Sequence, residues 1–288
     1  MSDLHERVHT WYADHARVLP WREPSATPWA VMVSEFMLQQ TPVARVLPVF
    51  EMWMLMWPTP ADLAAASSGD AIRAWGRLGY PRRALRLHQV ATTIVARHDG
   101  RVPSWHADLR ALPGAGDYTA AAVASFAFGQ RHVVLDTNVR RVFARVLTGS
   151  QFPASTVTKS ERELAATLLP DDASTAAAWA VGVMELGALV CTSGSPKCGS
   201  CPISDMCAWR NNGYPAYDGP PRRGQTYAGT DRQCRGRLLA VLRDADEPVH
   251  RSRLDVSWSP DDQRDRCLHS LLDDGLATRL PGDLYALP

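Results

Sequence analysis

Apolar residues recur along most of this chain at helical spacing, and runs that alternate apolar with polar residues are scarce before the C-terminal part. Prolines and glycines interrupt the pattern often, which predicts helices of modest length. The predicted helices cover residues 3–15, 28–40, 42–57, 68–78, 82–98, 118–128, 137–147, 159–169, 175–191, 235–243, 251–255 and 263–273. The pattern therefore predicts a mainly α-helical protein.

The chain of 288 residues is long enough for two or three domains. Its clearest boundary is residues 218–233, where proline, glycine and polar residues predict a linker. Beyond it, three short helical segments and a hairpin around Pro281 and Gly282 predict a small winged-helix-like domain over 234–288. This segment could contact DNA, bind a protein partner or cap the fold, and the sequence leaves the three open.

Charge and hydropathy narrow the class of protein only slightly. The 31 basic and 30 acidic residues leave a net charge of +1, which does not exclude a basic face on one side. The richest apolar stretch, Val43 to Pro58, contains Arg45 and Glu51, so no membrane span is expected. Because no secretory signal precedes the chain, we expect a cytoplasmic protein that does not bind membranes.

Four cysteines, Cys191, Cys198, Cys201 and Cys207, form a C-x6-C-x2-C-x5-C run. Four thiolates are the usual ligands of a [4Fe-4S] cluster, and loops of this length let the chain surround one. The alternatives are a zinc site or two disulfides. Zinc sites prefer two tight cysteine pairs and only one is present, while disulfides are rare in reducing compartments. The spacing favours a [4Fe-4S] cluster.

The segment Leu112-Pro113-Gly114-Ala115-Gly116 precedes an alanine-rich helical stretch. Two glycines allow a tight turn, and we expect Asp117 to cap the following helix. Amide groups at such a helix start can bind a phosphate of nucleic acid without reading its base. The motif alone is weak, because many helical hairpins need glycine only to reverse direction.

Together with VVLDTNVRR and the cysteine run, the hairpin LPGAGDYTA resembles the helix-hairpin-helix DNA glycosylases related to endonuclease III. Within them, LPWRE, VSEFMLQQTPV and GRLGYPRRA are similar to the MutY-type adenine DNA glycosylases. The resemblance covers about residues 3–217. It implies a two-domain core, with a six-helix barrel at 28–131 and an iron–sulfur cluster domain formed by 1–27 and 132–217. Residues 234–288 are too few for the usual C-terminal domain that reads 8-oxoguanine.

The resemblance implies excision of adenine mispaired with 8-oxoguanine or guanine in double-stranded DNA. Glu35 would be the general acid that protonates the leaving adenine; a lone glutamate would otherwise be an exposed helix residue. Asp136 would stabilise the positive charge left on the sugar, as an ion or as a transient nucleophile, and Asn138 would orient it. Asp136 could equally cap the helix that follows it.

Tyr118 stands where the bifunctional relatives carry a lysine that forms a Schiff base with the sugar. A phenol cannot form an imine, so the resemblance implies a monofunctional glycosylase that leaves an abasic site. Without the resemblance, Tyr118 would be an aromatic residue packed at a helix start. The two other readings of the chain are a thymine or damaged-pyrimidine glycosylase of this fold and a non-catalytic iron–sulfur regulator that binds DNA.

The remaining family-like residues would contact DNA. Gln40 and Tyr80 resemble side chains that fill the duplex when a nucleotide leaves the stack, although Tyr80 could as well be a buried loop residue. Trp21 and Arg22 resemble residues near the adenine pocket. The expected phosphate contacts are Gly114, Gly116, Arg82, Arg83, Arg86, Arg140, Arg141 and Lys197, with solvated helix faces as the ordinary alternative for the arginines. We expect a monomer associated with the bacterial nucleoid, in which the cluster stabilises a DNA-binding loop.

Overall fold

The computed structural model describes residues 3–220 and 227–288. Residues 1–2 and 221–226 lie outside the description, and with them the start of the predicted 1–27 segment and the middle of the predicted linker at 218–233. The chain divides into two compact units. The first comprises Met1–Val31, Ser104–Ala111 and Ala115–Pro221, and the second comprises Met32–Pro103, Leu112–Gly114 and Arg222–Pro288. The predicted domain limits at 28–131 and 132–217 stay predictions.

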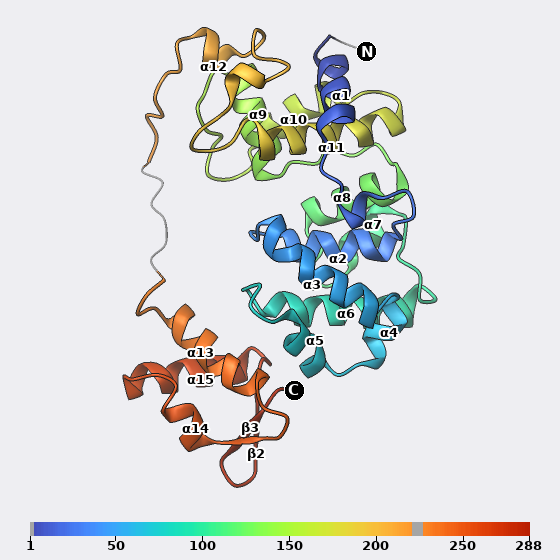
Figure 1. The fold of residues 1–288 in the computed structure, drawn as a ribbon. Helices are drawn as coiled ribbons and strands as arrows, with labels where there is room; N and C mark the ends of the chain where they lie inside the picture. The colour runs from blue at the N-terminus through green and yellow to red at the C-terminus, as the bar shows by residue number, and fades with distance from the viewer. Residues whose placement is uncertain (1–2, 221–226) are drawn as a thin grey trace. The chain divides into compact units, whose positions relative to one another are not determined.

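The first unit is helical throughout its described part (Figure 1). Its elements are α1 (Asp3–His15), η1 (Pro20–Arg22), α7 (His106–Ala111), α8 (Asp117–Phe128), α9 (Thr137–Leu147), α10 (Lys159–Thr167), α11 (Ala173–Leu189), η2 (Cys198–Ser200) and α12 (Ala208–Asn211). Helix α11 is the centre of this unit, because α1, α8 and α9 all pack against it. Val8 of α1, Val142 of α9 and Val183 of α11 belong to one buried cluster, which fixes the helix that leads into the cysteine run.

The helix α2 (Pro28–Leu38) starts in the first unit and ends in the second. Thr27 caps it: the Thr27 hydroxyl accepts a hydrogen bond from the Ala30 amide at 3.1 Å, and Pro28 is the first helical residue. The remaining helices of residues 32–103 in the second unit are α3 (Val43–Met56), α4 (Pro60–Ala65), α5 (Ser68–Trp75) and α6 (Arg82–Arg97). Helix α6 packs against α4 and α5, and the buried rings of Trp53, Trp57 and Trp75 meet edge to face.

The C-terminal part of the second unit has the element order of a winged helix. Its elements are α13 (Asp231–Arg243), β1 (Val249–His250), α14 (Arg251–Asp255), α15 (Asp261–Asp273), β2 (Thr278–Leu280) and β3 (Leu284–Ala286). The strands form an antiparallel sheet in the order β1-β3-β2, with Val249 opposite Tyr285 and Arg279 opposite Tyr285 on its other side. The predicted hairpin around Pro281 and Gly282 is present between β2 and β3, while the domain limits at 234–288 stay a prediction.

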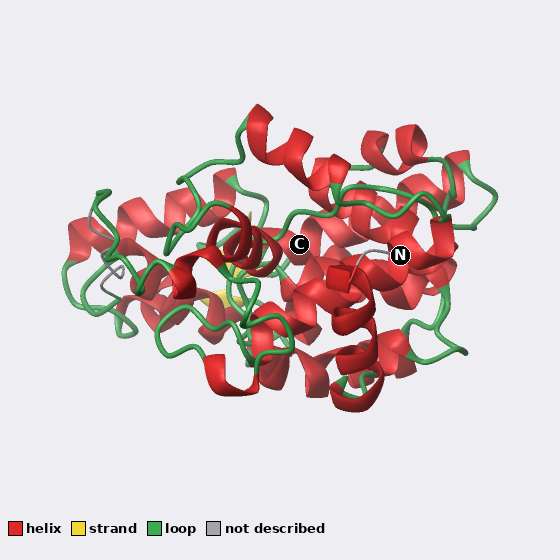
Figure 2. Ribbon diagram, turned by 90° about the horizontal axis from the view of Figure 1, so that it is seen from above, coloured by secondary structure: helices red, strands yellow, loops and turns green. Residues whose placement is uncertain are grey.

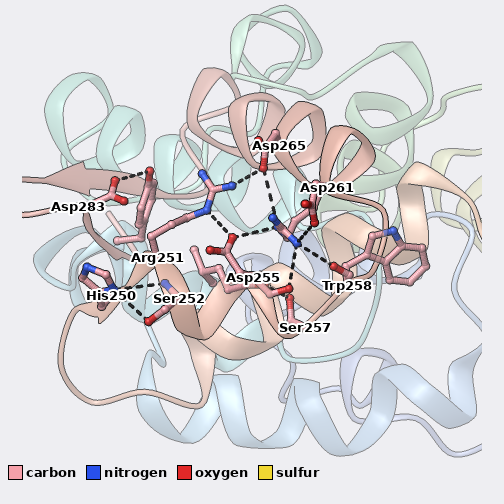
Figure 3. A network of polar contacts seen from close by, with 12 residues as sticks. His250, Arg251, Ser252, Asp255, Ser257, Trp258, Asp261, Asp265 and Asp283 are labelled. Atoms are coloured by element: carbon pink, nitrogen blue, oxygen red, sulfur yellow. Dashed lines mark hydrogen bonds and ion pairs between the residues drawn. The ribbon is translucent and has the colours of Figure 1, made fainter.

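A network of arginines and aspartates connects α14 to α15 in this domain (Figure 3). Asp255 accepts from Arg251 at 2.6 Å and lies 3.0 Å from Arg264, while Arg251 also pairs with Asp265. Arg264 is buried and donates to the Trp258 carbonyl at 3.1 Å. Because each charge has a partner of opposite sign, the network holds the two helices without leaving a buried charge unpaired.

Helices dominate the described residues, and the three short strands lie in the C-terminal domain alone (Figure 2). Every helix predicted from periodicity is present with limits within a few residues. Helices α4 and α7 were not predicted, since six residues give too little periodicity to detect. Among the described helices, none has both the length and the apolar content needed to cross a bilayer.

Candidate functional site

Asp136 occupies the N-cap of α9, as the capping alternative predicted. Its Oδ1 accepts a hydrogen bond from the Val139 amide at 2.6 Å, and its Oδ2 accepts one from the Asn138 side chain at 2.7 Å. Burial raises the pKa of the Asp136 carboxyl, while these two bonds and the charge of Arg141 limit the rise. The arrangement gives a fixed, partly desolvated carboxylate whose position is set by the helix start.

Asn138 and Arg141 connect this carboxylate to the start of the cysteine run. The Asn138 Oδ1 accepts from Arg141 Nη2 at 2.8 Å, and Arg141 Nε donates to the Cys191 carbonyl at 2.7 Å. Arg141 also donates to the Gly187 carbonyl at 2.6 Å. A Cβ at Gly187 would lie 2.7 Å from the Asn138 Cβ, so only glycine lets α11 approach α9 this closely. Asp136 and the cysteine run are thus two ends of one hydrogen-bonded series.

The four predicted ligands, Cys191, Cys198, Cys201 and Cys207, line one cavity. All four are free thiols, which excludes the disulfide alternative. Burial raises the pKa of the Cys191 thiol. Burial also raises the pKa of the Cys201 thiol, to about 11. Ionising these two thiols therefore requires a nearby positive centre.

Arg145 supplies one such positive charge. Its side chain is only 1% exposed, and Nη1 lies 3.3 Å from the Cys191 sulfur. The same guanidinium donates to the carbonyls of Thr192 at 2.8 Å and Ser193 at 3.1 Å, and its plane lies over the Trp209 ring at 4.6 Å. Arg145 therefore holds the first turn of the cysteine loop and faces the sulfur of its first cysteine.

The four thiols around this cavity match the ligand set of an iron–sulfur cluster. Four cysteine thiolates are the usual ligands of a [4Fe-4S] cluster. The residues present fit a [4Fe-4S] cluster. Lys197, within the loop, is exposed.

Trp21 and Arg22 lie in the short helix η1, and a buried carboxylate holds Arg22. Glu185 of α11 is fully buried and accepts from Arg22 at 2.9 Å and from Arg17 at 2.7 Å through both of its oxygens. Burial alone would raise the pKa of Glu185, but the hydrogen bonds from Arg17 and Arg22 outweigh it and lower that pKa to about 2. Trp21 is buried, and Nη1 of Arg22 is a buried donor without a hydrogen-bond partner among the described residues.

The start of α8 differs from the prediction. Its N-cap is Gly116, and Asp117 is the first helical residue instead of the cap. The Asp117 carboxylate pairs with Arg110 at 2.6 Å, which leaves the amide groups of the first turn uncovered by a capping side chain. Tyr118 follows on this turn and packs against a small buried cluster that contains Ala121 and Ala180. The alternative for Tyr118, an aromatic residue packed at a helix start, agrees with this placement, while its role in a monofunctional glycosylase stays a prediction.

Glu35 is buried on α2 at 5% exposure, so the alternative of an exposed helix glutamate is wrong. Its neighbours along the helix, Val31 and Met32, are also buried. A carboxyl group in this place is shielded from bulk water, as the proposed proton donor to a bound base would be. Glu35 belongs to the second unit and Asp136 to the first.

Gln40 and Tyr80 lie at the same groove of the second unit, which has a volume of about 1190 Å³. Both have left-handed backbones, with φ of 55° and 49°, a strained conformation for residues with a side chain. Tyr80 is 45% exposed and its ring lies 5.1 Å from the Arg83 guanidinium, so it is not the buried loop aromatic of the alternative. The exposed residues Arg45, Arg77, Arg82 and Arg86 line the same groove.

Gly114 also adjoins this group. Its φ is +76°, and a Cβ there would lie 2.7 Å from Cδ of Arg86. Glycine at this position therefore serves both the backbone conformation and the close approach of Arg86. Gly116, by contrast, has an ordinary φ of −80° and open space around it.

Three of the predicted phosphate contacts are buried and bound within the protein. Arg83 donates to the carbonyls of Phe36 and Met37 at 3.1 Å each, and burial lowers its pKa to about 10. Arg140 pairs with Glu161 at 2.9 Å, and Arg141 forms the series described above. The predictions of phosphate contacts at Arg83, Arg140 and Arg141 are wrong, because guanidinium groups without exposed surface cannot reach DNA. Arg82 and Arg86 are exposed.

Sequence reasoning missed Arg145 and Glu185. Arg145 lies one helical turn after Arg141 on α9, so the two arginines share one side of the helix. This i, i+4 spacing was the signal that could have pointed to Arg145. Glu185 carried a weaker one: it is a single acid in the long apolar stretch of α11, where an unpaired charge would be costly.

Comparison with known families gives two matches. Residues 33–167 match the model of the HhH-GPD superfamily of base excision DNA repair proteins. Residues 191–207, which begin and end at the outer cysteines, match the iron-sulfur binding domain of endonuclease III.

Individual proteins resemble the chain over nearly its whole length. The adenine DNA glycosylase of Mycobacterium tuberculosis H37Rv is 56% identical over 280 residues, which span 96% of this chain and 91% of that protein. The adenine DNA glycosylase of Mycolicibacterium smegmatis is 52% identical over 281 residues, which span 96% of this chain and 94% of that protein. Among solved structures, a thermostable thymine-DNA glycosylase superposes with a TM-score of 0.65 at 26% identity, over 73% of this chain and 95% of that one.

Proposed function

Since the chain belongs to the adenine DNA glycosylases of the HhH-GPD superfamily, we propose that it removes adenine paired with 8-oxoguanine or with guanine in double-stranded DNA. It is a base excision repair enzyme that hydrolyses the N-glycosidic bond of adenine, and it binds DNA and a [4Fe-4S] cluster. The observation that carries this assignment is the 56% identity, which extends through the C-terminal domain as well as the core. The identity of the opposite base is the proposed part.

The two carboxyl groups would divide the reaction between them. Glu35, buried at 5% exposure, would donate a proton to a ring nitrogen of adenine as the bond to the sugar breaks. Asp136, held by two hydrogen bonds, would stabilise the positive charge that develops on the sugar carbon. Water then adds to that carbon and loses a proton, so the products are free adenine and an abasic site.

The neighbours of these groups would position them. Asn138 donates to Asp136 and would fix the direction of its free lone pairs. Tyr118 cannot form the imine that a lysine would form, in agreement with hydrolysis without strand cleavage. The unpartnered Nη1 of Arg22, beside the buried Trp21, would be available to the extruded adenine.

Binding would use several separate parts of the chain. The exposed Gln40 and Tyr80 would fill the space that the extruded nucleotide leaves in the stack. Gly114, Gly116 and the exposed Lys197 would contact phosphates. We propose Cys191, Cys198, Cys201 and Cys207 as the cluster ligands, with the cluster stabilising the loop that carries Lys197. The protein would act as a monomer in the cytoplasm, at the nucleoid.

The test is single-turnover excision on matched duplexes that contain adenine opposite 8-oxoguanine, guanine or thymine, and thymine opposite guanine. We expect release of adenine from the first two alone. Release of thymine from the T·G duplex would instead support the second candidate, for which the thymine-DNA glycosylase structure is the supporting observation. Binding without release from any duplex would support a regulator.

A further inference from the structure

The groove that holds Gln40 and Tyr80 has a second wall, which the C-terminal domain provides. Arg232, Arg235, Arg237 and Arg243, all from α13, line it together with the residues of the Tyr80 turn. Asp274 is the acidic residue among the described residues of the lining. We propose that this arginine groove binds the sugar-phosphate backbone of duplex DNA, with α13 as its DNA-contacting helix.

The surface of α13 has two distinct sides. Cys234, Leu238 and Leu242 are buried, and α13 packs against α15, so the apolar side faces the domain's own core. Arg232 and Arg237 on the remaining surface are exposed, and Arg232 lies over the Tyr227 ring at 5.3 Å. The helix carries four arginines against one aspartate. Because the apolar side of α13 packs within the domain, its exposed arginine side is the surface that a ligand could reach.

The groove carries positive charge that the protein does not neutralise. Asp274 pairs with both Arg82 and Arg235 and so offsets one charge. Among the described residues, Arg77, Arg86 and Arg237 have no acidic side chain within ion-pair distance. A concave surface with a single sign of charge concentrates the opposite charge. Closely spaced phosphates are the ligand of matching charge and length, since each one contacted releases bound counterions.

The two walls are joined, so the groove is a fixed feature of the second unit. Arg73 of α5 donates to the Ala245 carbonyl at 2.9 Å, and Arg243 of α13 donates to the Gly76 carbonyl. A Cβ at Gly69 of α5 would lie 2.3 Å from the Pro288 carbonyl oxygen, which shows how closely the residues after β3 approach that helix. Phosphates held by α13 would therefore lie at a set distance from Tyr80.

The helix proposed here to contact DNA, α13, differs from the helix that winged-helix proteins usually place on DNA. In winged-helix and helix-turn-helix proteins the recognition helix enters the major groove, and α15 stands in that place. However, α15 carries four aspartates against two arginines, and its Arg264 is buried and paired with Asp255. DNA would be repelled there. The domain would thus use its first helix, and it would bind backbone rather than bases.

The experiment measures the affinity of the full-length holoprotein for a fluorescent 20-base-pair duplex at several salt concentrations. Arg237→Gln should weaken binding roughly 5-fold at 100 mM salt and reduce the slope of log K against log salt by about 0.9. Arg232→Gln combined with Arg237→Gln should reduce that slope by about 1.8. Arg253→Gln is the matched control, since Arg253 is exposed in the same domain but lies outside the arginine groove, and it should bind as the wild type does.

Wild-type affinity and slope in the Arg237→Gln protein would overturn the proposal. So would an equal loss in Arg253→Gln, or a larger one in Arg266→Gln of α15, because either would place the contact elsewhere. The inference rests on the proposed function only in taking duplex DNA as the ligand. Adenine release by the wild type is measured separately. If the wild type releases no adenine but Arg237→Gln still weakens DNA binding, the proposed function is wrong and the proposed DNA-binding groove stands.

Discussion

The side-chain amide of Asn138 lies 2.7 Å from the Asp136 carboxylate and donates a hydrogen bond to it. The other oxygen of Asp136 is engaged by the Val139 amide, so both oxygens are held from the first turn of α9. The helix start orients the carboxylate, and its dipole favours the ionised form. Capping and catalysis are therefore compatible uses of one side chain.

We expect Asn138→Ala to move the acid limb of the excision rate to higher pH. The proposed mechanism needs ionised Asp136, so the rate should fall as the pH drops through the pKa of this group, which burial already raises. Removing a hydrogen bond that opposes the rise increases that pKa further, and misplacement should lower the rate roughly 10-fold to 100-fold. Single-turnover rates between pH 5 and 9 measure the shift. Asn212→Ala, at an exposed asparagine, should leave the profile unchanged.

Glu35→Gln should reduce adenine excision by at least about 100-fold, because an amide cannot donate the proton that a carboxylic acid gives. The duplex affinity should stay close to that of the wild type, since the substitution preserves size and hydrogen-bonding capacity. Glu51→Gln, on the exposed face of α3, is the matched control. Excision by Glu35→Gln at the rate of this control would remove Glu35 from the mechanism.

Arg145→Gln should loosen the cysteine loop. The substitution removes a buried charge that donates to the carbonyls of Thr192 and Ser193, and hydrogen bonds from charged groups contribute about 1.5–3 kcal/mol each. We expect the free energy of unfolding to fall by about 3 kcal/mol and the visible absorbance of the cluster to decay faster in a chelator. Arg162→Gln, at an exposed arginine, should change neither. Equal decay rates in the two variants would contradict the role of Arg145.

Gly114→Ala should cost more stability than Gly100→Ala, although the two glycines have nearly the same φ of +76° and +73°. A Cβ at Gly100 meets nothing within 4 Å, whereas one at Gly114 lies 2.7 Å from Arg86. The shared backbone strain costs about 1 kcal/mol, and Gly114→Ala adds the displacement of Arg86. Urea unfolding of both variants makes the comparison. Equal midpoints would show that Arg86 moves aside without cost.

Glu185→Gln should make the first unit less stable at neutral pH. The pKa of Glu185 is lowered to about 2, so its ion pairs stabilise the fold fully above the ordinary glutamate range and lose that contribution as the pH falls toward 2. The variant should be less stable by about 2–4 kcal/mol at pH 7. The difference from the wild type should shrink between pH 5 and pH 2. A difference independent of pH, measured by chemical unfolding, would exclude the charge as its source.

Much of the fold was readable because apolar periodicity, caps and breakers agree along the chain. Thr27 with Pro28 marked the start of α2, and the C-terminal helices and hairpin are where composition placed them. The cap of α8 was read wrongly because Asp117 is an excellent capping residue by type, yet its carboxylate is drawn to Arg110. The intrinsic preference of a residue for a helix start does not reveal an ion pair with a residue of another helix, here Arg110 of α7.

The arginines were the hardest part of the site to predict. The positions next to the family motifs suggested phosphate contacts for Arg83, Arg140 and Arg141. In the structure each of them instead donates to backbone carbonyls or pairs with an acidic side chain of its own unit. The exposed arginines of α13 gave no signal, since charged residues on one side of a helix are usually solvated. Burial depends on which elements pack together, and a single sequence does not carry that information.

The series of hydrogen bonds from Asp136 through Asn138 and Arg141 ends at the Cys191 carbonyl, so it links the order of the cysteine loop to the direction of the Asp136 carboxylate. If the four cysteines hold the cluster as proposed, protein made without iron should keep the Asp136 side chain but hold it less firmly. Its amount by mass would then overstate its turnover.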